Sequence, residues 1–181
     1  MEFVELKEAS PATKNRALTI AQILRGSEYA LTLFSAEEVA APELFDRNGK
    51  TYLTCAVTLK PRPATTEEIV RQLYLRKMMD EYGYLPDRIA IEKQVYFGSS
   101  VHEKAADIVV WDKGTIDTPY IIVECKKPKR KDGLEQLKSY CNAEGSPIGV
   151  WTNGGETIYL HREDSTPLGP SSTEHPSHLH L

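Results

Sequence analysis

The second half of the chain switches between two hydrophobic periods, and this switching constrains the fold more than any other feature of the sequence. Residues 65–82 combine strong helix formers with a capping-box pattern at Thr65 and Glu68, and no Gly or Pro interrupts them. A period of two then marks three runs rich in β-branched and aromatic residues, at 89–97, 105–111 and 120–126. A second helix is predicted over 133–143, and two further strands over 148–152 and 157–161. This order of elements predicts a mixed α/β sandwich.

The first 62 residues predict a smaller extension. A helix is expected at about residues 14–24, where Gly26 would end it. Residues 29–34 are rich in β-formers, and the tight-turn dipeptide Asn48-Gly49 precedes an alternating run, so residues 29–60 predict a small antiparallel ribbon. Residues 1–12 are expected to be an ill-ordered lead, and residues 165–181, rich in Pro, Ser and His, a flexible tail or linker stub.

Charge and composition limit the partners of the chain. The net charge is −4, so no global positive field indicates a nucleic-acid partner. Residues 124–138 nevertheless carry six basic side chains against three acidic ones, a local charge of +3 that could meet phosphates. The basic residues proposed for DNA contacts are Lys127, Lys129, Arg130 and Lys131. The alternative for each of them is a solvated loop lysine or arginine that only aids solubility.

Cysteine usage and apolar runs indicate the compartment. Cys55, Cys125 and Cys141 form neither an even set nor a CxxC pair, which favours buried thiols in a reducing environment. The apolar runs are too short to cross a bilayer, and the N-terminus is too acidic for a signal peptide. We therefore expect a cytoplasmic protein with no membrane partner.

Two carboxylates stand in strands that are otherwise apolar. Asp107 and Glu124 would each cost several kcal/mol to bury without compensation. Because side chains alternate along a strand, Glu124 shares a face with Lys126 while Cys125 points to the other face. If the two strands are neighbours, both carboxylates and the ammonium converge. Such a site suits Mg²⁺, with Mn²⁺ as a substitute, and predicts phosphodiester hydrolysis.

A plainer interpretation explains the same residues. Glu124 and Lys126 can form an ion pair at a strand end, with Asp107 as an acid near a turn. A Glu-x-Lys string also occurs at residues 5–7, where no strand is predicted, so the string alone decides nothing.

Several separated motifs resemble one family. Asp107 in an apolar strand followed by Glu124-Cys125-Lys126 resembles the PD-(D/E)xK nuclease motif. Five stretches resemble the N-terminal nuclease domain of the restriction (R) subunit of type I restriction–modification enzymes: ATTEEIVRQLYL (64–75), EYGY (81–84), IVECKKP (122–128), LEQLKSYC (134–141) and WTNG (151–154). The resemblance covers about residues 50 to 162. It implies a restriction endonuclease-like core with a mixed central sheet flanked by helices.

The resemblance also implies roles for individual positions. Asp107 and Glu124 would bind the metal together with the backbone carbonyl of Cys125, and Lys126 would be the catalytic lysine. Gln136 and Tyr140 match the QxxxY motif and share one helical face, where they would act in catalysis. Glu68 matches an acidic residue of the first core helix that completes the metal site.

Structural alternatives remain open for the helical residues. Glu68 could serve only the capping box. Gln136 and Tyr140 could pack beside the apolar stripe of their helix.

The sequence departs from the family in two ways. Ala105 and Ala106, rather than a proline, precede Asp107. A motor loop of the form Gly-x4-Gly-Lys-Ser/Thr is also missing, because Leu44 stands where the first glycine before Gly49 should be. ATP would therefore act only through a motor domain outside this chain. The chain itself would be an excised nuclease domain, a truncated gene product or a free-standing relative.

These observations predict a Mg²⁺-dependent endonuclease domain that cleaves double-stranded DNA, the nuclease module of a type I R subunit. Its partners would be a motor domain in cis and modification and specificity subunits. The predicted domains are an extension (1–62), a nuclease core (63–164) and the tail (165–181). The alternatives are the same module attached to a DNA methyltransferase or acting alone, and an inactive DNA-binding or assembly module.

Overall fold

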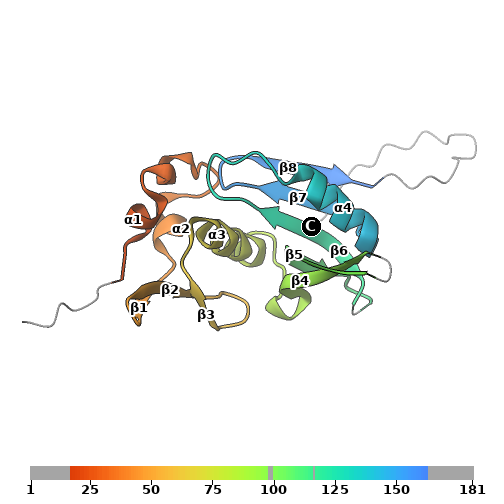
Figure 1. The fold of residues 1–181 in the computed structure, drawn as a ribbon, viewed down its shortest axis with the longest axis horizontal. Helices are drawn as coiled ribbons and strands as arrows, with labels where there is room; N and C mark the ends of the chain where they lie inside the picture. The colour runs from red at the N-terminus through yellow and green to blue at the C-terminus, as the bar shows by residue number, and fades with distance from the viewer. Residues whose placement is uncertain (1–16, 98–99, 116, 163–181) are drawn as a thin grey trace, which may run out of the picture.

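The computed structural model describes residues 17–97, 100–115 and 117–162 (Figure 1). The predictions for residues 1–12, for the start of the helix at 14–24 and for the tail at 165–181 lie outside the described residues.

A five-stranded mixed sheet organises the second half of the chain, in the order β4-β5-β6-β7-β8. The strands are β4 (Ile89–Phe97), β5 (Ser100–Trp111), β6 (Pro119–Cys125), β7 (Ile148–Thr152) and β8 (Thr157–His161). All neighbours pair antiparallel except β6 and β7, which run parallel because α4 (Leu134–Glu144) connects them. The predicted mixed α/β architecture is therefore confirmed.

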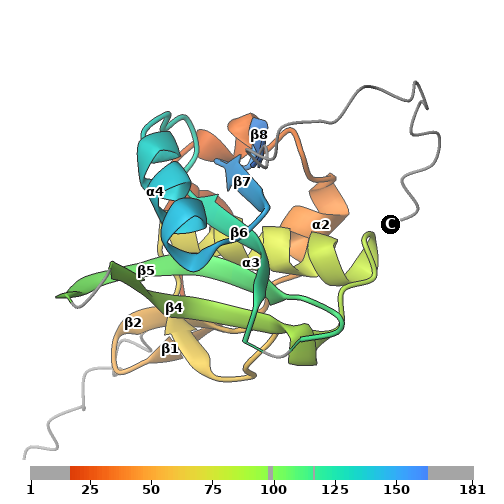
Figure 2. The same cartoon turned by 90° about the vertical axis from the view of Figure 1, so that its right-hand side faces the viewer.

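Two helices cover opposite faces of this sheet (Figure 2). α3 (Thr66–Asp80) packs on a core that includes Ile108 and Val123, whereas α4 packs on a second core around Trp151. Alternation along the strands explains the division, since Ile122 and Val123 enter different cores. The sheet is thus the middle layer of a sandwich.

The N-terminal region is more helical than the sequence predicts. From residue 17 on, it contains α1 (Ile20–Leu24), a 3₁₀ turn η1 (Ser27–Ala30) and α2 (Ala36–Ala40), followed by the first described strand. The strand expected over residues 29–34 is wrong. A capping box in which Ser35 and Glu38 exchange hydrogen bonds starts α2, and this local signal prevails over the β-propensity of the preceding residues.

The expected hairpin is present, although it begins later. β1 (Leu44–Arg47) and β2 (Lys50–Thr54) pair antiparallel, and β3 (Pro61–Pro63) completes a small sheet. Asn48 and Gly49 both take positive φ angles, 54° and 77°, as a type I′ turn requires. The Gly49-Lys50-Thr51 string therefore spans the end of a hairpin turn and the start of β2.

The extension and the main sheet share one hydrophobic core. Leu24, Leu31 and Leu53 are buried in the cluster that also contains Ile69 of α3. Gly154, after β7, accepts a hydrogen bond from the backbone N–H of Leu33 at 3.1 Å. The boundary predicted after residue 62 falls within β3.

Two further expectations concern the described residues. Cys55, Cys125 and Cys141 are all free and buried, as the sequence predicts. Among the described helices, none has both the length and the apolar character that a bilayer-spanning helix needs.

Candidate functional site

The site is built where β5 and β6 lie side by side. Ile108 pairs with Val123 in this antiparallel ladder, and Asp107 and Glu124 are the next residues of the two strands. The two acids therefore stand on neighbouring strands, as the sequence analysis requires. Asp107 is 8% exposed and Glu124 only 1%.

Glu124 has one satisfied oxygen and one orphaned oxygen. Its Oε1 accepts hydrogen bonds from the Lys126 ammonium and from Gln136 Nε2, the latter at 2.9 Å. Its Oε2 is buried and has no hydrogen-bond partner among the described residues. A buried carboxylate oxygen without a donor is costly, so this position favours a positively charged ligand.

Burial and charge set the protonation of this pair. Burial, reinforced by the negative charge of Asp107, raises the pKa of Glu124 to about 7 against the opposing influence of Lys126. Burial lowers the pKa of Lys126, but its hydrogen bond and charge interaction with Glu124 more than compensate, so the net pKa is raised. Without a further cation, Glu124 is thus partly protonated near neutral pH.

Glu124→Gln should therefore stabilise the fold more at alkaline than at acidic pH. The pKa of Glu124 in the folded state lies above its ordinary value, so the folded state is progressively destabilised as pH rises towards and through 7. Glutamine does not ionise, so the variant has no such loss. We expect the stabilisation to be larger at about pH 8 than at about pH 5 by on the order of 2 kcal/mol. Urea unfolding with a chelator present measures it, and a gain that is equal at both pH values contradicts the raised pKa.

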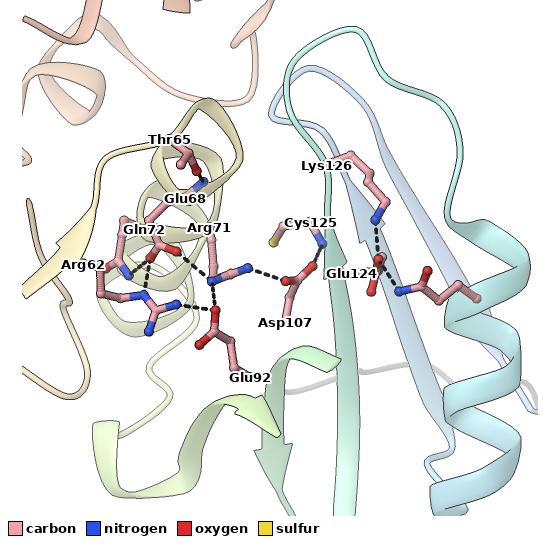
Figure 3. Close-up of polar contacts among 11 residues, drawn as sticks. Arg62, Thr65, Glu68, Arg71, Gln72, Glu92, Asp107, Glu124, Cys125 and Lys126 are labelled. Carbon is pink, nitrogen blue, oxygen red and sulfur yellow. Dashed lines mark hydrogen bonds and ion pairs between the residues drawn. The ribbon is translucent and has the colours of Figure 1, made fainter. Parts of the chain in front are cut away.

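Asp107 turns towards α3 rather than towards Lys126 (Figure 3). Its Oδ1 accepts a hydrogen bond from Arg71 Nη2 at 2.5 Å, and its Oδ2 accepts one from the backbone N–H of Cys125 at 2.7 Å. The Cys125 side chain lies in the α3-facing core, as alternation predicts. The strands are neighbours, but the hydrogen bonds of Asp107 do not join those of Glu124 and Lys126: Lys126 contacts Glu124, whereas Asp107 is held by Arg71 and the Cys125 N–H. Asp107 and Glu124 act on each other through their charges.

Arg71 is the centre of a buried ionic network that the sequence does not reveal. Its guanidinium bonds Asp107, Glu68 Oε2 at 2.7 Å and Glu92 Oε1 at 3.0 Å. Arg62 adds a second cation, because it pairs with Glu68 at 2.9 Å and with Glu92. Burial alone would lower the pKa of Arg71, but the charges of Asp107 and Glu68 raise it by more than burial lowers it. The net pKa is raised, so Arg71 stays charged.

Glu68 belongs to this network. The backbone N–H of Glu68 donates to Thr65 Oγ1 at 3.1 Å, which is half of a capping box. Its carboxylate, however, accepts from Arg62, Arg71 and Gln72 (Figure 3). Its role as a metal ligand stays a prediction, and both of its carboxylate oxygens accept hydrogen bonds from these three donors.

Glu67 is an acidic residue that the sequence analysis missed. Its negative charge raises the pKa of Glu124 and of Lys126 across the space between α3 and β6. Glu67 and Glu68 are adjacent in sequence, so only their different directions around the helix axis distinguish the roles of their side chains.

For Gln136 and Tyr140 of α4, the sequence left two interpretations open, a role in the site and packing within the helix, and the structure shows features of each. Gln136 contacts Glu124 directly, whereas Tyr140 is 1% exposed and packs beside Phe97, with ring centroids 6.2 Å apart. The Tyr140 hydroxyl has no hydrogen-bond partner within the described part of the chain. Gln136 therefore orients Glu124, and Tyr140 contributes packing and one unused polar group.

The loop from Lys126 to Gly133 is fixed by the strand that follows α4. Trp151 Nε1 donates to the Asp132 carbonyl and Asn153 Nδ2 to the Arg130 carbonyl, both at 2.8 Å. Gly133 has a φ of 100°, and a Cβ at this position would clash with the Lys126 side chain. The WTNG stretch and this glycine together shape the space for Lys126.

Beyond Lys126, the loop carries four basic residues that differ in their partners. Lys127, Lys129, Arg130 and Lys131 are all exposed. Arg130 pairs with Asp132, and Lys131 Nζ lies 3.2 Å from Glu156 Oε1. Lys127 and Lys129 form no ion pair within the described residues, so their charges are the more available for phosphates.

Two carboxylates, Asp107 and Glu124, are the candidates for holding a hard divalent cation. No group of three His, Cys, Asp or Glu side chains within residues 17–97, 100–115 and 117–162 is arranged to hold a metal. Glu124 Oε2 has no donor among these residues, whereas both oxygens of Asp107 already accept hydrogen bonds, from Arg71 and from the Cys125 N–H, so a cation would share Asp107 with these donors. Backbone carbonyls and water would complete the shell, as is usual for Mg²⁺.

Comparison with known proteins identifies the family. A comparison with curated proteins found no match. A family model described as the type I restriction enzyme R protein N terminus (HSDR_N) matches residues 66–169, which is more than half of the chain. The matched range contains α3, the five-stranded sheet and α4, and hence most of the residues of the site. The chain belongs to the family of type I restriction enzyme R protein N-termini.

Proposed function

We propose that the chain is a Mg²⁺-dependent endonuclease domain of the PD-(D/E)xK type that hydrolyses phosphodiester bonds of double-stranded DNA. The observation that carries the proposal is the buried, unpartnered Oε2 of Glu124, beside Asp107 and on the residue that Lys126 contacts. A divalent cation would satisfy this oxygen and offset the mutual repulsion of the two acids. The family supports a restriction-complex context.

Each residue has a distinct role in this proposal. Asp107 and Glu124 would hold the cation, with the Cys125 carbonyl as a further ligand. When bound, the cation would stabilise the negative charge that develops at the attacked phosphate. Lys126 keeps its ammonium beside Glu124, where it can donate to the attacked phosphate or to the water. Gln136 fixes the Glu124 carboxylate from the α4 side.

The plainer alternative is an inactive DNA-binding or assembly module that uses Glu124 and Lys126 only as an ion pair. In that alternative the Oε2 of Glu124 would stay buried without a donor from the described residues, at a cost in stability that nothing offsets. Burial and the charge of Asp107 raise the pKa of Glu124 to about 7 against the influence of Lys126, so the ion pair alone does not keep Glu124 fully charged near neutral pH, whereas a bound cation would.

Mn²⁺ should bind the wild-type chain and should raise its melting temperature by mass action. Asp107→Asn and Glu124→Gln should each abolish both effects, because each removes a carboxylate ligand while keeping its shape. Affinity should fall as pH drops below about 7, since protons then compete for Glu124. Titration calorimetry measures the binding, and Glu135→Gln, an exposed acid on α4, is the control. Equal Mn²⁺ binding by wild type and Glu124→Gln would disprove the metal assignment.

DNA binding should depend on the two loop lysines that lack acidic partners. Combined Lys127→Ala and Lys129→Ala should flatten the slope of log K against log salt by about 2, since each lost phosphate contact removes about 0.9. Arg130→Ala should change the slope less, because Asp132 already neutralises it. Fluorescence anisotropy with a labelled duplex measures the slopes, with the exposed Lys113→Ala as control. An unchanged slope in the double variant removes the loop from the DNA path.

A further inference from the structure

A hollow lies beside the proposed metal site, between α4 and the antiparallel pair of β4 and β5. Its cavity volume is about 390 Å³, within the range of sites that bind small ligands. We refer to it as the α4 hollow. The residues that line it are Phe97 of β4, Lys104 of β5, and Glu135, Gln136, Ser139 and Tyr140 of α4.

The α4 hollow adjoins the proposed metal site through one side chain. Gln136 lines the hollow and also donates to Glu124 Oε1 at 2.9 Å. Burial, reinforced by the negative charge of Glu124, raises the pKa of Tyr140, so the tyrosine hydroxyl keeps its proton and can donate it to an acceptor. A group bound in the hollow would therefore lie next to the phosphate that the proposed function attacks.

Lys104 supplies a positive charge to the α4 hollow. Because side chains alternate along β5, Lys104 lies on the same face as Ala106, which packs in the core beneath α4. Lys104 is exposed and forms no ion pair within the part of the chain that the structure describes. The one carboxylate of the lining, Glu135, is paired with Lys138 at 2.6 Å. The Lys104 ammonium is therefore available to an anion.

The Tyr140 side chain adds a hydrogen-bond donor that lacks an acceptor. Tyr140 is 1% exposed, and its hydroxyl forms no hydrogen bond with any described residue. A buried donor costs free energy until an acceptor reaches it. An anion with several oxygens, such as a phosphate, can accept from this hydroxyl and from the Lys104 ammonium together. The ring of Phe97, 6.2 Å from that of Tyr140, gives the hollow an apolar wall suited to a sugar.

The distance between Lys104 and Asp107 suits the spacing of a DNA strand. Three residues along β5 correspond to about 10 Å at about 3.3 Å per residue. A strand of duplex DNA advances about 3.4 Å per nucleotide, so a flexible lysine at this distance can reach a phosphate about one to three nucleotides away. We propose that Lys104 and Tyr140 bind a backbone phosphate of the DNA strand beside the one that is cleaved. This inference rests on the proposed function for its substrate, and it adds Lys104, which lies in none of the five stretches that resemble the family.

Duplex binding by the full chain tests the inference, measured by fluorescence anisotropy with a chelator present. Lys104→Gln should flatten the slope of log K against log salt by about 0.9, the contribution of one phosphate contact. Tyr140→Phe should weaken binding about tenfold at a fixed salt concentration, because it removes a hydrogen bond to a charged group. It should leave the slope unchanged, since it removes no charge. Tyr140→Phe should not lower the melting temperature, because the hydroxyl has no described partner to lose.

The double variant shows whether both side chains hold the same phosphate. Lys104→Gln combined with Tyr140→Phe should weaken binding less than the product of the two single effects, because either change alone already displaces the phosphate. Lys113→Gln is the matched control, since Lys113 is also exposed but lies between β5 and β6. Its effect, if any, should simply multiply with that of Tyr140→Phe.

Three results would overturn the inference. One is a wild-type affinity and salt slope in Lys104→Gln, and another is fully multiplicative effects of Lys104→Gln and Tyr140→Phe. The third is displacement of the duplex by inorganic phosphate at constant ionic strength that Lys104→Gln prevents, because the hollow would then be a site for free phosphate.

The chelator separates this inference from the metal assignment. If Mn²⁺ fails to bind but the coupled effects of Lys104 and Tyr140 remain, the nuclease proposal fails and the phosphate site stands. If Mn²⁺ binds and the Lys127 and Lys129 variants weaken DNA binding while Lys104→Gln and Tyr140→Phe have no effect, only the phosphate site is rejected. No duplex binding by the wild-type chain would reject both.

Discussion

Arg71→Met should destabilise the chain by about 3–5 kcal/mol, the cost of breaking a buried ion pair by removing one partner. Arg71 is 6% exposed and is the cation shared by Asp107, Glu68 and Glu92. Methionine preserves much of the side-chain volume, so the loss would reflect charge and hydrogen bonding rather than a cavity. Urea unfolding without divalent cations measures the change.

Two further variants distinguish a buried network from an ordinary ion pair. Arg130→Met removes an exposed arginine that also pairs with a carboxylate, and it should have little effect on stability because solvent screens that pair. Asp107→Asn combined with Arg71→Met should lose less stability than the sum of the two single changes, because each single variant leaves the other group unpaired. Additive effects, or a small effect of Arg71→Met alone, would show that the network contributes little.

The Arg71 network also bears on the metal site. Arg71 holds one oxygen of Asp107 and the Cys125 N–H holds the other, so Asp107 is fixed in position before any cation arrives. Glu92 adopts a left-handed backbone conformation with a φ of 49°, which is uncommon for glutamate, and its contacts with Arg62 and Arg71 oppose the associated strain. Stability and preorganisation of the site are therefore coupled through one arginine.

Local patterns were sufficient to predict the elements around the site. Period-two runs defined the strands carrying Asp107 and Glu124, and alternation correctly placed Lys126 on the face of Glu124, away from Cys125. These features depend on residues close in sequence, which is why the sequence reveals them.

The ionic network could not be predicted because its members come from distant elements. Arg71 and Asp107 are 36 residues apart. In sequence, Glu68, Arg71 and Gln72 have the composition of a solvated helix face, yet all three are buried. α3 lies between the main sheet and the small β1–β2–β3 sheet, so it has little solvent-facing surface (Figure 1). An amphipathic pattern does not describe a helix that is covered on both sides.

Lys126→Ala, tested in the complete enzyme assembly with ATP, should abolish DNA cleavage while DNA binding and ATP hydrolysis continue. Lys126 contacts Glu124 and belongs to the proposed chemical step, whereas a motor and a specificity subunit would supply the other two functions. Lys127→Ala is the matched control, because Lys127 is adjacent in sequence but exposed and outside the Glu124 contact. It should weaken DNA binding slightly and leave cleavage at saturating DNA near the wild-type rate. Cleavage, filter binding and ATPase assays on the same preparations measure the three functions.

The pattern of losses distinguishes the possible roles of Lys126. Wild-type cleavage by Lys126→Ala would remove it from catalysis and favour a simple strand-end ion pair with Glu124. Loss of cleavage together with ATP hydrolysis would mean that the residue supports the fold or couples the domains. Loss of cleavage alone, with Mn²⁺ binding retained, would assign Lys126 to the chemical step, because the carboxylates that hold the cation would still be intact.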